Sequence, residues 1–275
     1  MHQRDRDVTG IPMRWVENGD GFPVVLVHGI PTTPALWRDV MPLVHGRCLA
    51  FEMVGYGDSI PAGRDRDISV ARQADYLLSW LDTLGIERAV LVGHDLGGGV
   101  VQIAAARDSQ RCAGLVLTNA IAYDSWPIPS VRGLRAAGRI VERLPDLLFK
   151  LLIASFMVRG HDNLNVGRES GRIHARPYLE HGGAAALIRQ IRSLDVHDTL
   201  AVQHDLPKLG VPARVVWGAA DRFQKVGYGQ RLASDLGTTL TRIDGGKHWM
   251  PEDHPDLIAG AINNVLDEVG ASLSS

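Results

Sequence analysis

Short apolar runs rich in β-branched residues recur along most of this chain and alternate with amphipathic segments. The apolar runs predict buried strands, and they cover residues 12–17, 23–28, 47–53, 88–93, 112–118, 213–218 and 238–243, with 12–17 as the first strand. Apolar positions spaced three and four apart predict helices between Ser69 and Gly85 and over residues 97–107, 228–236 and 255–268. This alternation favours an α/β fold, with a mostly parallel sheet and helices on both of its faces.

The alternation stops between about Tyr123 and Leu206. This stretch contains prolines at positions 127, 129, 145 and 177, together with helical patterns that are rich in arginine. We interpret it as a helical cap inserted into the sheet domain, so that residues 1–121 and 207–275 form the core and residues 122–206 form the cap. The arginines fit the solvent-facing sides of amphipathic helices better than a funnel for anionic substrates.

Composition sets limits on the possible functions. A chain of 275 residues can bury a large core in one domain with an insert. Its 29 basic and 31 acidic residues nearly cancel, which gives no sign of binding to nucleic acid or to a membrane surface. Residues 1–8 are too polar for a signal peptide, and no apolar run approaches the roughly 18 residues of a membrane helix. We therefore expect a cytoplasmic protein, with Cys48 and Cys112 as buried free thiols.

The strongest candidate chemistry lies in residues 91–99, Leu-Val-Gly-His-Asp-Leu-Gly-Gly-Gly. A strand runs into Gly93-His94-Asp95-Leu96-Gly97 and a helical pattern follows, which is the arrangement of a nucleophile elbow with aspartate in place of serine. The glycines let strand and helix approach closely. A carboxylate attacks carbonyl carbons poorly, but it can displace a leaving group from a saturated carbon and form an alkyl ester. Taken alone, Asp95 would also suit a helix N-cap.

Backbone donors for this site are expected from two places. His28-Gly29-Ile30-Pro31 follows an early strand, and a turn there can direct the N–H of Ile30 toward Asp95. The N–H of Leu96, at the start of the following helix, faces the same space and favours negative charge. Together these two groups would form an oxyanion hole.

A carboxylate and a histidine complete the predicted site. Asp221 follows the strand at 213–218, and His248 lies in a glycine-hinged loop after the last strand. Alone, the first could be a turn residue and the second a structural histidine. The chain order of nucleophile, acid and histidine is nevertheless the one expected for a hydrolase triad on this kind of sheet.

The chain resembles the α/β-hydrolase superfamily, in the branch with an aspartate nucleophile, which contains the epoxide hydrolases and the haloalkane dehalogenases. The resemblance spans nearly the whole chain outside the predicted cap. Besides the three candidate catalytic residues, it rests on His28-Gly29-Ile30-Pro31 with Trp37 beyond it, and on Gly55-Tyr56-Gly57-Asp58-Ser59 after the third strand. These motifs are specific for the fold and the nucleophile, and much less specific for the substrate.

This resemblance implies a two-step reaction that needs no metal and no organic cofactor. Asp95 attacks a saturated carbon and breaks its bond to oxygen or halogen, which leaves an alkyl-enzyme ester. His248, oriented by Asp221, then removes a proton from water, and the hydroxide attacks the carbonyl carbon of the ester. The implied substrates are a small apolar epoxide or halide and water. We expect the protein to be a monomer or a homodimer.

The leaving group separates the two branches of the family. Dehalogenases hold the halide with a Trp directly after the nucleophile and often with an Asn in the His-Gly loop, and here these positions are Leu96 and Ile30, whose side chains cannot donate. Fluoroacetate-type dehalogenases carry arginines right after the nucleophile and one turn on, where this chain has Leu96 and Gly99. We therefore predict an epoxide hydrolase, with a haloalkane or haloacid dehalogenase as the alternative.

Epoxide hydrolases supply the proton for the leaving oxygen from cap tyrosines. The candidate leaving-group donors here are Tyr123 and Tyr178, neither at the family's usual place, and Trp126, which could equally serve a halide. Further possible donors in the predicted cap are His174, His181 and His197. An esterase or lactonase and a non-catalytic binding protein of the same fold are less favoured, because nucleophile, acid and base are all present.

Overall fold

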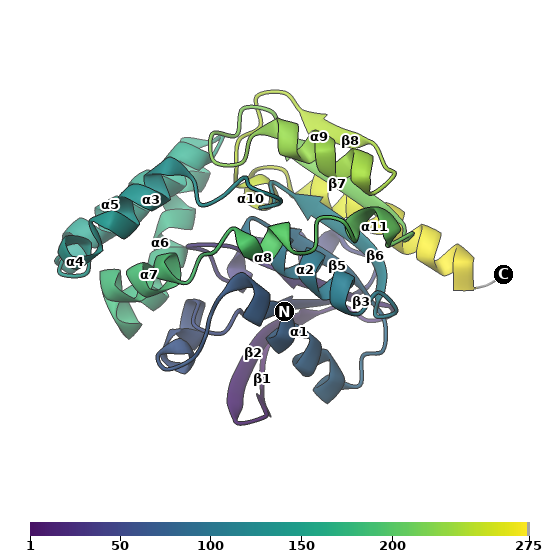
Figure 1. Cartoon of the computed structure of the whole chain (residues 1–275), viewed down its shortest axis with the longest axis horizontal. Coiled ribbons are helices and arrows are strands. Elements are labelled where there is room, and N and C mark those ends of the chain that lie inside the picture. Colours follow the sequence, from purple (N-terminus) through teal and green to yellow (C-terminus); the bar gives the residue numbers. More distant parts are fainter. Residues whose placement is uncertain (274–275) are drawn as a thin grey trace.

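The computed structural model describes residues 1–273, which contain one eight-stranded sheet (Figure 1). The strands lie in the order β1-β2-β4-β3-β5-β6-β7-β8. Neighbouring strands from β4 to β8 are parallel, whereas β2 is antiparallel to both β1 and β4. The strands are β1 His2–Val8, β2 Ile11–Asn18, β3 Pro23–Val27, β4 Arg47–Phe51, β5 Ala89–His94, β6 Cys112–Thr118, β7 Ala213–Gly218 and β8 Leu240–Ile243. The predicted α/β fold with a mostly parallel sheet is confirmed.

Residues 12–17 form a strand, as predicted, but it is β2 and not the first strand, because β1 precedes it. Only Val8 of β1 is buried, so the strand shows no apolar alternation that could reveal it. It pairs with β2 from His2 opposite Glu17 to Val8 opposite Ile11. Charged side chains on an edge strand discourage pairing with another chain, which explains why an ordered strand here has so polar a sequence.

Side chains of the inner strands alternate between two cores, as the period of two in a strand requires. In β3, Val25 and Val27 face one core, whereas Val24 and Leu26 face the other. The first core is covered by α1 Val70–Leu84, α2 Leu96–Arg107 and α9 Val226–Asp235, and the second by η1 Pro34–Trp37 and α11 Pro255–Leu273. Helices therefore cover both faces of the sheet, as the sequence predicts.

Both predicted ends of α1 are confirmed. The hydroxyl of Ser69 accepts a hydrogen bond from the N–H of Arg72, and Gly85 ends the helix in the left-handed region at φ 67°. An N-cap of this kind stabilises a helix by about 1 kcal/mol. The short helices elsewhere in the core are η2 Met41–Leu43, η3 Gly57–Gly63, η4 Leu206–Lys208 and α10 Met250–Asp253.

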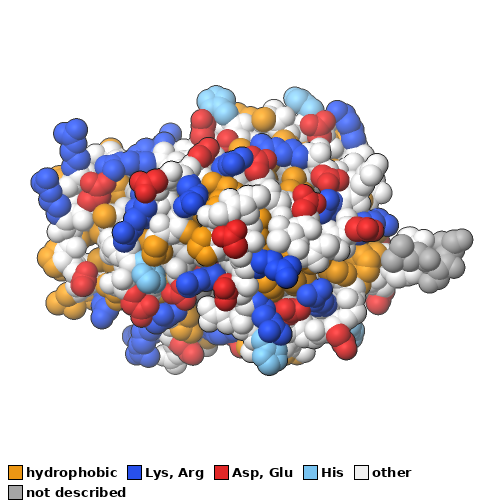
Figure 2. All heavy atoms as spheres, turned by 90° about the horizontal axis from the view of Figure 1, so that it is seen from below, with side chains coloured by type: hydrophobic (Ala, Val, Ile, Leu, Met, Phe, Trp, Pro, Cys, Tyr) orange, Lys and Arg blue, Asp and Glu red, His pale blue; other side chains and the backbone are white. Residues whose placement is uncertain are grey.

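The interval between β6 and β7 is helical, in the stretch where the sequence predicts a cap. It holds α3 Pro129–Ala136, α4 Gly138–Val141, α5 Asp146–Gly160, α6 Leu164–His181, α7 Gly183–Arg192 and α8 His197–Leu200. Helices α3 to α7 form the end of the molecule at the left of Figure 1. Basic and hydrophobic side chains lie side by side on this end in Figure 2, and the exposed hydrophobic residues include Ile140, Leu147, Leu148, Leu151 and Leu164.

Cys48 and Cys112 are buried free thiols, as predicted. Burial raises the pKa of each thiol to about 12, so both stay protonated and unreactive near neutral pH. Among the helices of residues 1–273, none combines the length and the hydropathy needed to cross a membrane.

Candidate active site

The predicted catalytic residues meet at the carboxyl edge of the sheet. Asp95 follows β5, Asp221 follows β7, and His248 lies in the loop between β8 and α10. Because the carboxyl ends of parallel strands share one edge, side chains far apart in the sequence come together there. All three side chains are buried.

Asp95 stands on a tight turn between β5 and α2. Its backbone has φ 51° and ψ −122°, a conformation that costs a residue other than glycine about 1–3 kcal/mol. Two glycines make the turn possible, because a Cβ on Gly97 would lie 2.1 Å from the carbonyl oxygen of Val27, and one on Gly93 would lie 2.5 Å from that of Gly97. The Asp95 side chain makes no N-cap hydrogen bond to α2, so the N-cap alternative does not describe it.

The two carboxylate oxygens of Asp95 have different surroundings. Oδ2 accepts a hydrogen bond of 2.9 Å from the backbone N–H of Ile30. Oδ1 lies 4.0 Å from Nε2 of His248. Burial raises the pKa of Asp95, and the charge of His248 and the backbone N–H groups of Ile30 and Leu96 oppose this rise. Of the two predicted backbone donors, Ile30 therefore hydrogen-bonds the carboxylate in this structure and Leu96 acts on its pKa, while Oδ1 remains open.

His248 is held so that one ring nitrogen stays available. Its Nδ1 donates to Oδ2 of Asp221 over 2.8 Å, which leaves Nε2 as the acceptor. The Nε2–H of His94 donates to the backbone carbonyl of His248 over 2.9 Å, so the residue before Asp95 anchors the histidine loop. Burial by itself would lower the pKa of His248, but the charge and hydrogen bond of Asp221 and the charge of Asp95 raise it.

Asp221 is fixed by a residue that the sequence analysis did not identify. Asn119, directly after β6, donates from Nδ2 to Oδ2 of Asp221 over 2.6 Å, and its Oδ1 accepts from the N–H of Gly218. The N–H of Phe223 donates to Oδ1 of Asp221 over 2.7 Å. Burial favours the neutral acid, but His248, Asn119 and Phe223 together lower the pKa of Asp221. A polar residue at the carboxyl end of a central strand was the signal in the sequence.

His28 supports the turn that carries Ile30. Its Nδ1 donates to the carbonyl of Gly29 over 2.9 Å, and its Nε2 accepts from the N–H of Met53 over 3.2 Å. Burial lowers the pKa of His28 to about 3, so the ring is neutral. A Cβ on Gly29 would lie 2.4 Å from Oδ2 of Asp95, which explains the glycine. The motif therefore shapes the donor loop, and its last residue, Pro31, lines the second cavity described below.

A cavity of about 40 Å³ lies over Asp95 and His248. Its walls are largely apolar and come from both the core and the helices between β6 and β7; they include Leu96, Ile121, Trp126, Val131, Phe156 and Leu194. A second cavity of about 50 Å³ shares Ile30, Val131 and Phe156 with the first and is lined by apolar residues throughout. The two cavities therefore lie side by side and share part of their walls.

The structure does not bring the two candidate tyrosines to this cavity. The hydroxyl of Tyr123 donates to Oδ2 of Asp235 over 2.6 Å, and that of Tyr178 donates to Oε1 of Gln190 over 2.6 Å. Trp126 does line the cavity, but its indole N–H donates to Oγ1 of Thr199 over 2.7 Å. The three candidate histidines are paired elsewhere: His174 with Glu252, His181 with Asp58 and His197 with Asp195.

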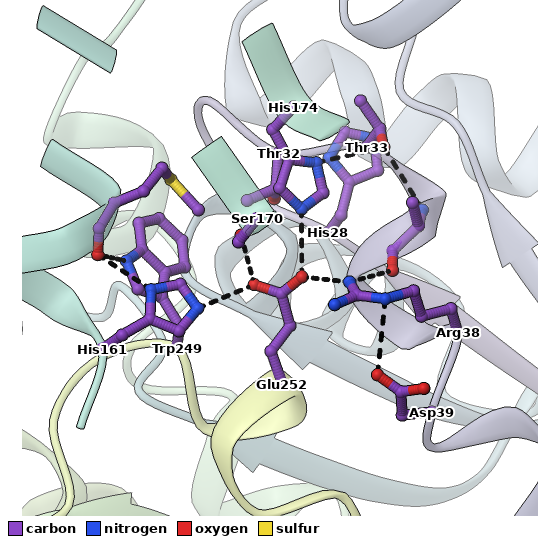
Figure 3. Close-up of polar contacts among 12 residues, drawn as sticks. His28, Thr32, Thr33, Arg38, Asp39, His161, Ser170, His174, Trp249 and Glu252 are labelled. Carbon is purple, nitrogen blue, oxygen red and sulfur yellow. Dashed lines mark hydrogen bonds and ion pairs between the residues drawn. The ribbon is translucent and has the colours of Figure 1, made fainter. Parts of the chain in front are cut away.

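A buried carboxylate four residues beyond His248 ties the helices between β6 and β7 to the core (Figure 3). Glu252, on α10, accepts hydrogen bonds from His161 over 3.0 Å, Ser170 over 2.5 Å and His174 over 3.3 Å, and it pairs with Arg38 of the core. Burial opposes ionisation, but the hydrogen bonds of His161 and His174 and the charges of His174 and Arg38 hold the pKa of Glu252 well below its usual range. No local motif marks this cluster, because its members are scattered along the chain.

The histidine loop is also bound to the end of α5. The N–H groups of His248 and Trp249 both donate to the carbonyl of Gly160, over 2.9 and 3.1 Å. The indole of Trp249 donates to the carbonyl of Met157 over 3.1 Å, and the backbone N–H of Lys247 donates to Asp162 over 2.7 Å. The position of His248 therefore depends on the inserted helices as well as on the sheet.

Within residues 1–273, one group of side chains has the spacing of a metal site. Its members are Asp58, Glu180 and His181, at a partly exposed surface. Arg176 already forms ion pairs with Asp58 and Glu180, which supplies the positive charge that a cation would otherwise bring. None of these residues lines the cavity over Asp95.

Known proteins resemble this chain in sequence and in fold. The family described as alpha/beta hydrolase fold matches residues 23–255. A haloalkane dehalogenase from Mesorhizobium japonicum is 31% identical, over 94% of this chain and 88% of its own length. An alpha/beta hydrolase fold protein from Burkholderia ambifaria has a TM-score of 0.84 at 28% identity, covering 96% of this chain and all of that one. The epoxide hydrolase CorEH has a TM-score of 0.80 at 19% identity, over 98% and 99% of the two chains, a likeness in fold alone.

A mostly parallel sheet that carries Asp95, Asp221 and His248 in this order and at one edge defines an α/β hydrolase. The chain belongs to the α/β-hydrolase superfamily, in its dehalogenase-like branch. Relatives of this kind support a hydrolytic activity.

Proposed function

We propose that this protein is a covalent hydrolase that cleaves carbon–halogen bonds in small apolar compounds, with Asp95 as the nucleophile. Oδ1 of Asp95 would attack the carbon while Oδ2 stays bonded to the N–H of Ile30. The carbon–halogen bond breaks, the halide leaves with the electron pair, and an alkyl ester forms on the enzyme. A partly desolvated carboxylate with one open oxygen suits this step.

The second step returns the enzyme to its starting state. Nε2 of His248 takes a proton from water, and the resulting hydroxide attacks Cγ of the Asp95 ester. The negative charge then develops on the oxygen that already accepts from Ile30, where each backbone donor contributes about 3 kcal/mol of stabilisation. Asp221 holds the imidazole in the tautomer that leaves Nε2 free. Collapse of the intermediate breaks the bond between Cγ and the alkyl oxygen, and the leaving alkoxide takes the proton back from His248 and departs as the alcohol.

The choice of halide over epoxide rests on one observation. Of the described residues that line the cavity over Asp95, none carries a hydroxyl group. Opening an epoxide produces an alkoxide, which needs a proton, whereas a halide needs only hydrogen bonds. The two tyrosines that could have supplied a proton donate to Asp235 and Gln190 instead. The dehalogenase relative from Mesorhizobium japonicum adds support.

Epoxide hydrolysis is the second candidate, favoured by one property of His248. This imidazole reaches the cavity, and its pKa is raised by Asp221 and Asp95 against the effect of burial. Its protonated form could give a proton to the epoxide oxygen and then serve as the base for the second step. The position of His248 argues against this role. His248 lies beside Asp95, whereas the epoxide oxygen would leave on the side of the carbon opposite to the attacking carboxylate.

The apolar walls of the two cavities support a hydrocarbon substrate without charged groups. The walls of the second cavity include Leu134, Leu152, Ile153, Leu187 and Ile191, in addition to the residues that it shares with the cavity over Asp95. These five residues come from α3, α5 and α7, so we assign the helices between β6 and β7 the role of a cap that shapes the substrate site. Narrow volumes of about 40 and 50 Å³ favour a slender alkyl chain over a bulky ring system.

The test compares two substrate classes on the purified protein. Incubation with 1-bromobutane should release bromide and butanol in equal amounts, whereas styrene oxide should yield little diol. A His248→Gln variant should accumulate a butyl ester that appears in the intact mass, and an Asp95→Asn variant should show no adduct. Diol formation without bromide release would contradict the proposed dehalogenase activity and favour epoxide hydrolysis. Bromide release without any adduct on the His248→Gln variant would contradict the covalent mechanism.

A further inference from the structure

Gln224 is a buried carboxamide without a partner at the candidate site. The residue is 3% exposed, and it lines the same cavity as Asp95 and His248. Its Oε1 accepts no hydrogen bond, and its Nε2 donates none within residues 1–273. Buried polar groups are nearly always hydrogen-bonded, so a carboxamide without a partner beside the nucleophile marks a place where a ligand group can bind.

The backbone, rather than the side-chain amide, holds Gln224 in place. The indole N–H of Trp217 donates to the carbonyl of Gln224 over 2.9 Å. One residue earlier, the N–H of Phe223 is bonded to Asp221. The neighbours Arg222 and Lys225 line an outer groove that does not include Gln224. Gln224 therefore faces the cavity over Asp95, and its loop is held by the hydrogen bond between Phe223 and Asp221.

We propose that the carboxamide of Gln224 binds the leaving halide, an inference that rests on the proposed function. Among the described residues that line the cavity, the polar ones are Asp95, Trp126, Gln224 and His248. The first and last perform the chemistry, and the indole N–H of Trp126 is taken by Thr199. Gln224 is left as the donor for a departing anion. Its amide would take the place of the side-chain donors that dehalogenases carry at the positions of Leu96 and Ile30.

The chemistry of a carboxamide matches a halide and not an alkoxide. Its Nε2 offers two N–H donors, but an amide is far too weak an acid to give up a proton. As the bond from Oδ1 of Asp95 to carbon forms and the carbon–halogen bond breaks, the halide takes the electron pair and gains a hydrogen bond from Gln224. In the second step, hydroxide attacks Cγ and the alcohol leaves with Oδ1 of Asp95, so the oxygen of water enters the carboxylate. The proton that His248 takes from this water passes to the leaving alkoxide, and the other proton of the water is released when the new carboxyl group ionises. The balance is one alkyl halide and one water to one alcohol, one proton and one halide.

The test uses Gln224→Met, which keeps the length of the side chain and removes both donors. Single-turnover reactions with enzyme in excess, on 1-chlorobutane, 1-bromobutane and 1-iodobutane, follow halide release as the first step and alcohol release as the second. The rate of the first step should fall about 10- to 100-fold with 1-chlorobutane, as expected for the loss of one hydrogen bond to a charged group. The fall should be smaller with 1-iodobutane, because iodide is a better leaving group and a weaker acceptor. The second step should be unchanged.

Lys225→Met is the matched control, because Lys225 lies on the same loop and lines the outer groove. It should behave as the wild type in both steps. An unchanged first step in Gln224→Met, an equal fall for all three halides, or a fall confined to the second step would each overturn the assignment. The last result would mean that Gln224 positions the water. A wild type that releases no halide from any of the three substrates would refute the proposed function and this inference with it.

Discussion

Replacing Glu252 by glutamine tests whether the buried cluster beyond His248 holds the inserted helices on the core. Oε1 of Glu252 accepts from Arg38 and His174, and Oε2 accepts from His161 and Ser170. A glutamine can turn its oxygen toward Arg38 and His174 and its NH₂ group toward Ser170 and His161, because a hydroxyl and a neutral imidazole can both accept. Glu252→Gln therefore keeps the four contacts but removes the negative charge from all of them.

The cost of this change can be worked from the structure. Hydrogen bonds to a charged group contribute about 1.5–3 kcal/mol each and neutral ones about 0.5–1.5 kcal/mol, so weakening all four amounts to roughly 4–6 kcal/mol. The side chain of Arg38 is 21% exposed, and water will recover part of its loss. We expect a fall of about 3–5 kcal/mol in the free energy of unfolding, the range for removal of one partner from a buried ion pair. For a chain of this size that corresponds to a Tm lower by roughly 5–10 °C.

Urea and thermal unfolding measure the change, with Glu180→Gln as the control. Glu180 also pairs with an arginine, Arg176, but both side chains are about half exposed, so its loss should cost less than about 1 kcal/mol. The pKa of Glu252 is held well below its usual range, so its contribution is present above the unfolded pKa and is lost as pH falls through the folded pKa. The difference between wild type and Glu252→Gln should therefore shrink in acid. Equal losses for the two variants, or a difference that grows in acid, would refute the reasoning.

Two further predictions concern turnover. Burial raises the pKa of Asp95, and Asp221 and Asp95 raise that of His248 against burial. Since both groups work deprotonated, turnover should rise with pH from the weakly acidic range, where Asp95 ionises, through neutrality, where His248 loses its proton, and then level off. A profile that falls over this range would mean that one of the two acts as a proton donor. Asp221→Asn should slow ester hydrolysis by about 10²–10⁴-fold, because the imidazole loses its orienting acceptor, while halide release in a single turnover stays near wild type. An equal loss in both steps would show that the carboxylate matters for folding rather than for the base.

Local signals predicted much of the fold and the core of the site. Strand β6, both ends of α1 and the glycines around Asp95 follow from short stretches of sequence, because periodicity, caps and tight turns are properties of neighbouring residues. Strand β1 escaped prediction because it is exposed along almost its whole length. An edge strand can be stabilised by pairing with β2 alone, so it needs no apolar pattern of its own.

The sequence by itself predicted the candidate nucleophile, its acid and base, and the backbone donors, because each of these follows a strand and has a motif around it. Only the tertiary structure decided which side chains surround the leaving group. Tyr123 looked like a proton donor, but its hydroxyl donates to Asp235, 112 residues further along the chain. Gln224 had no motif, yet it lines the cavity over Asp95. The direction of such a side chain depends on contacts between distant segments, and no local pattern records those contacts.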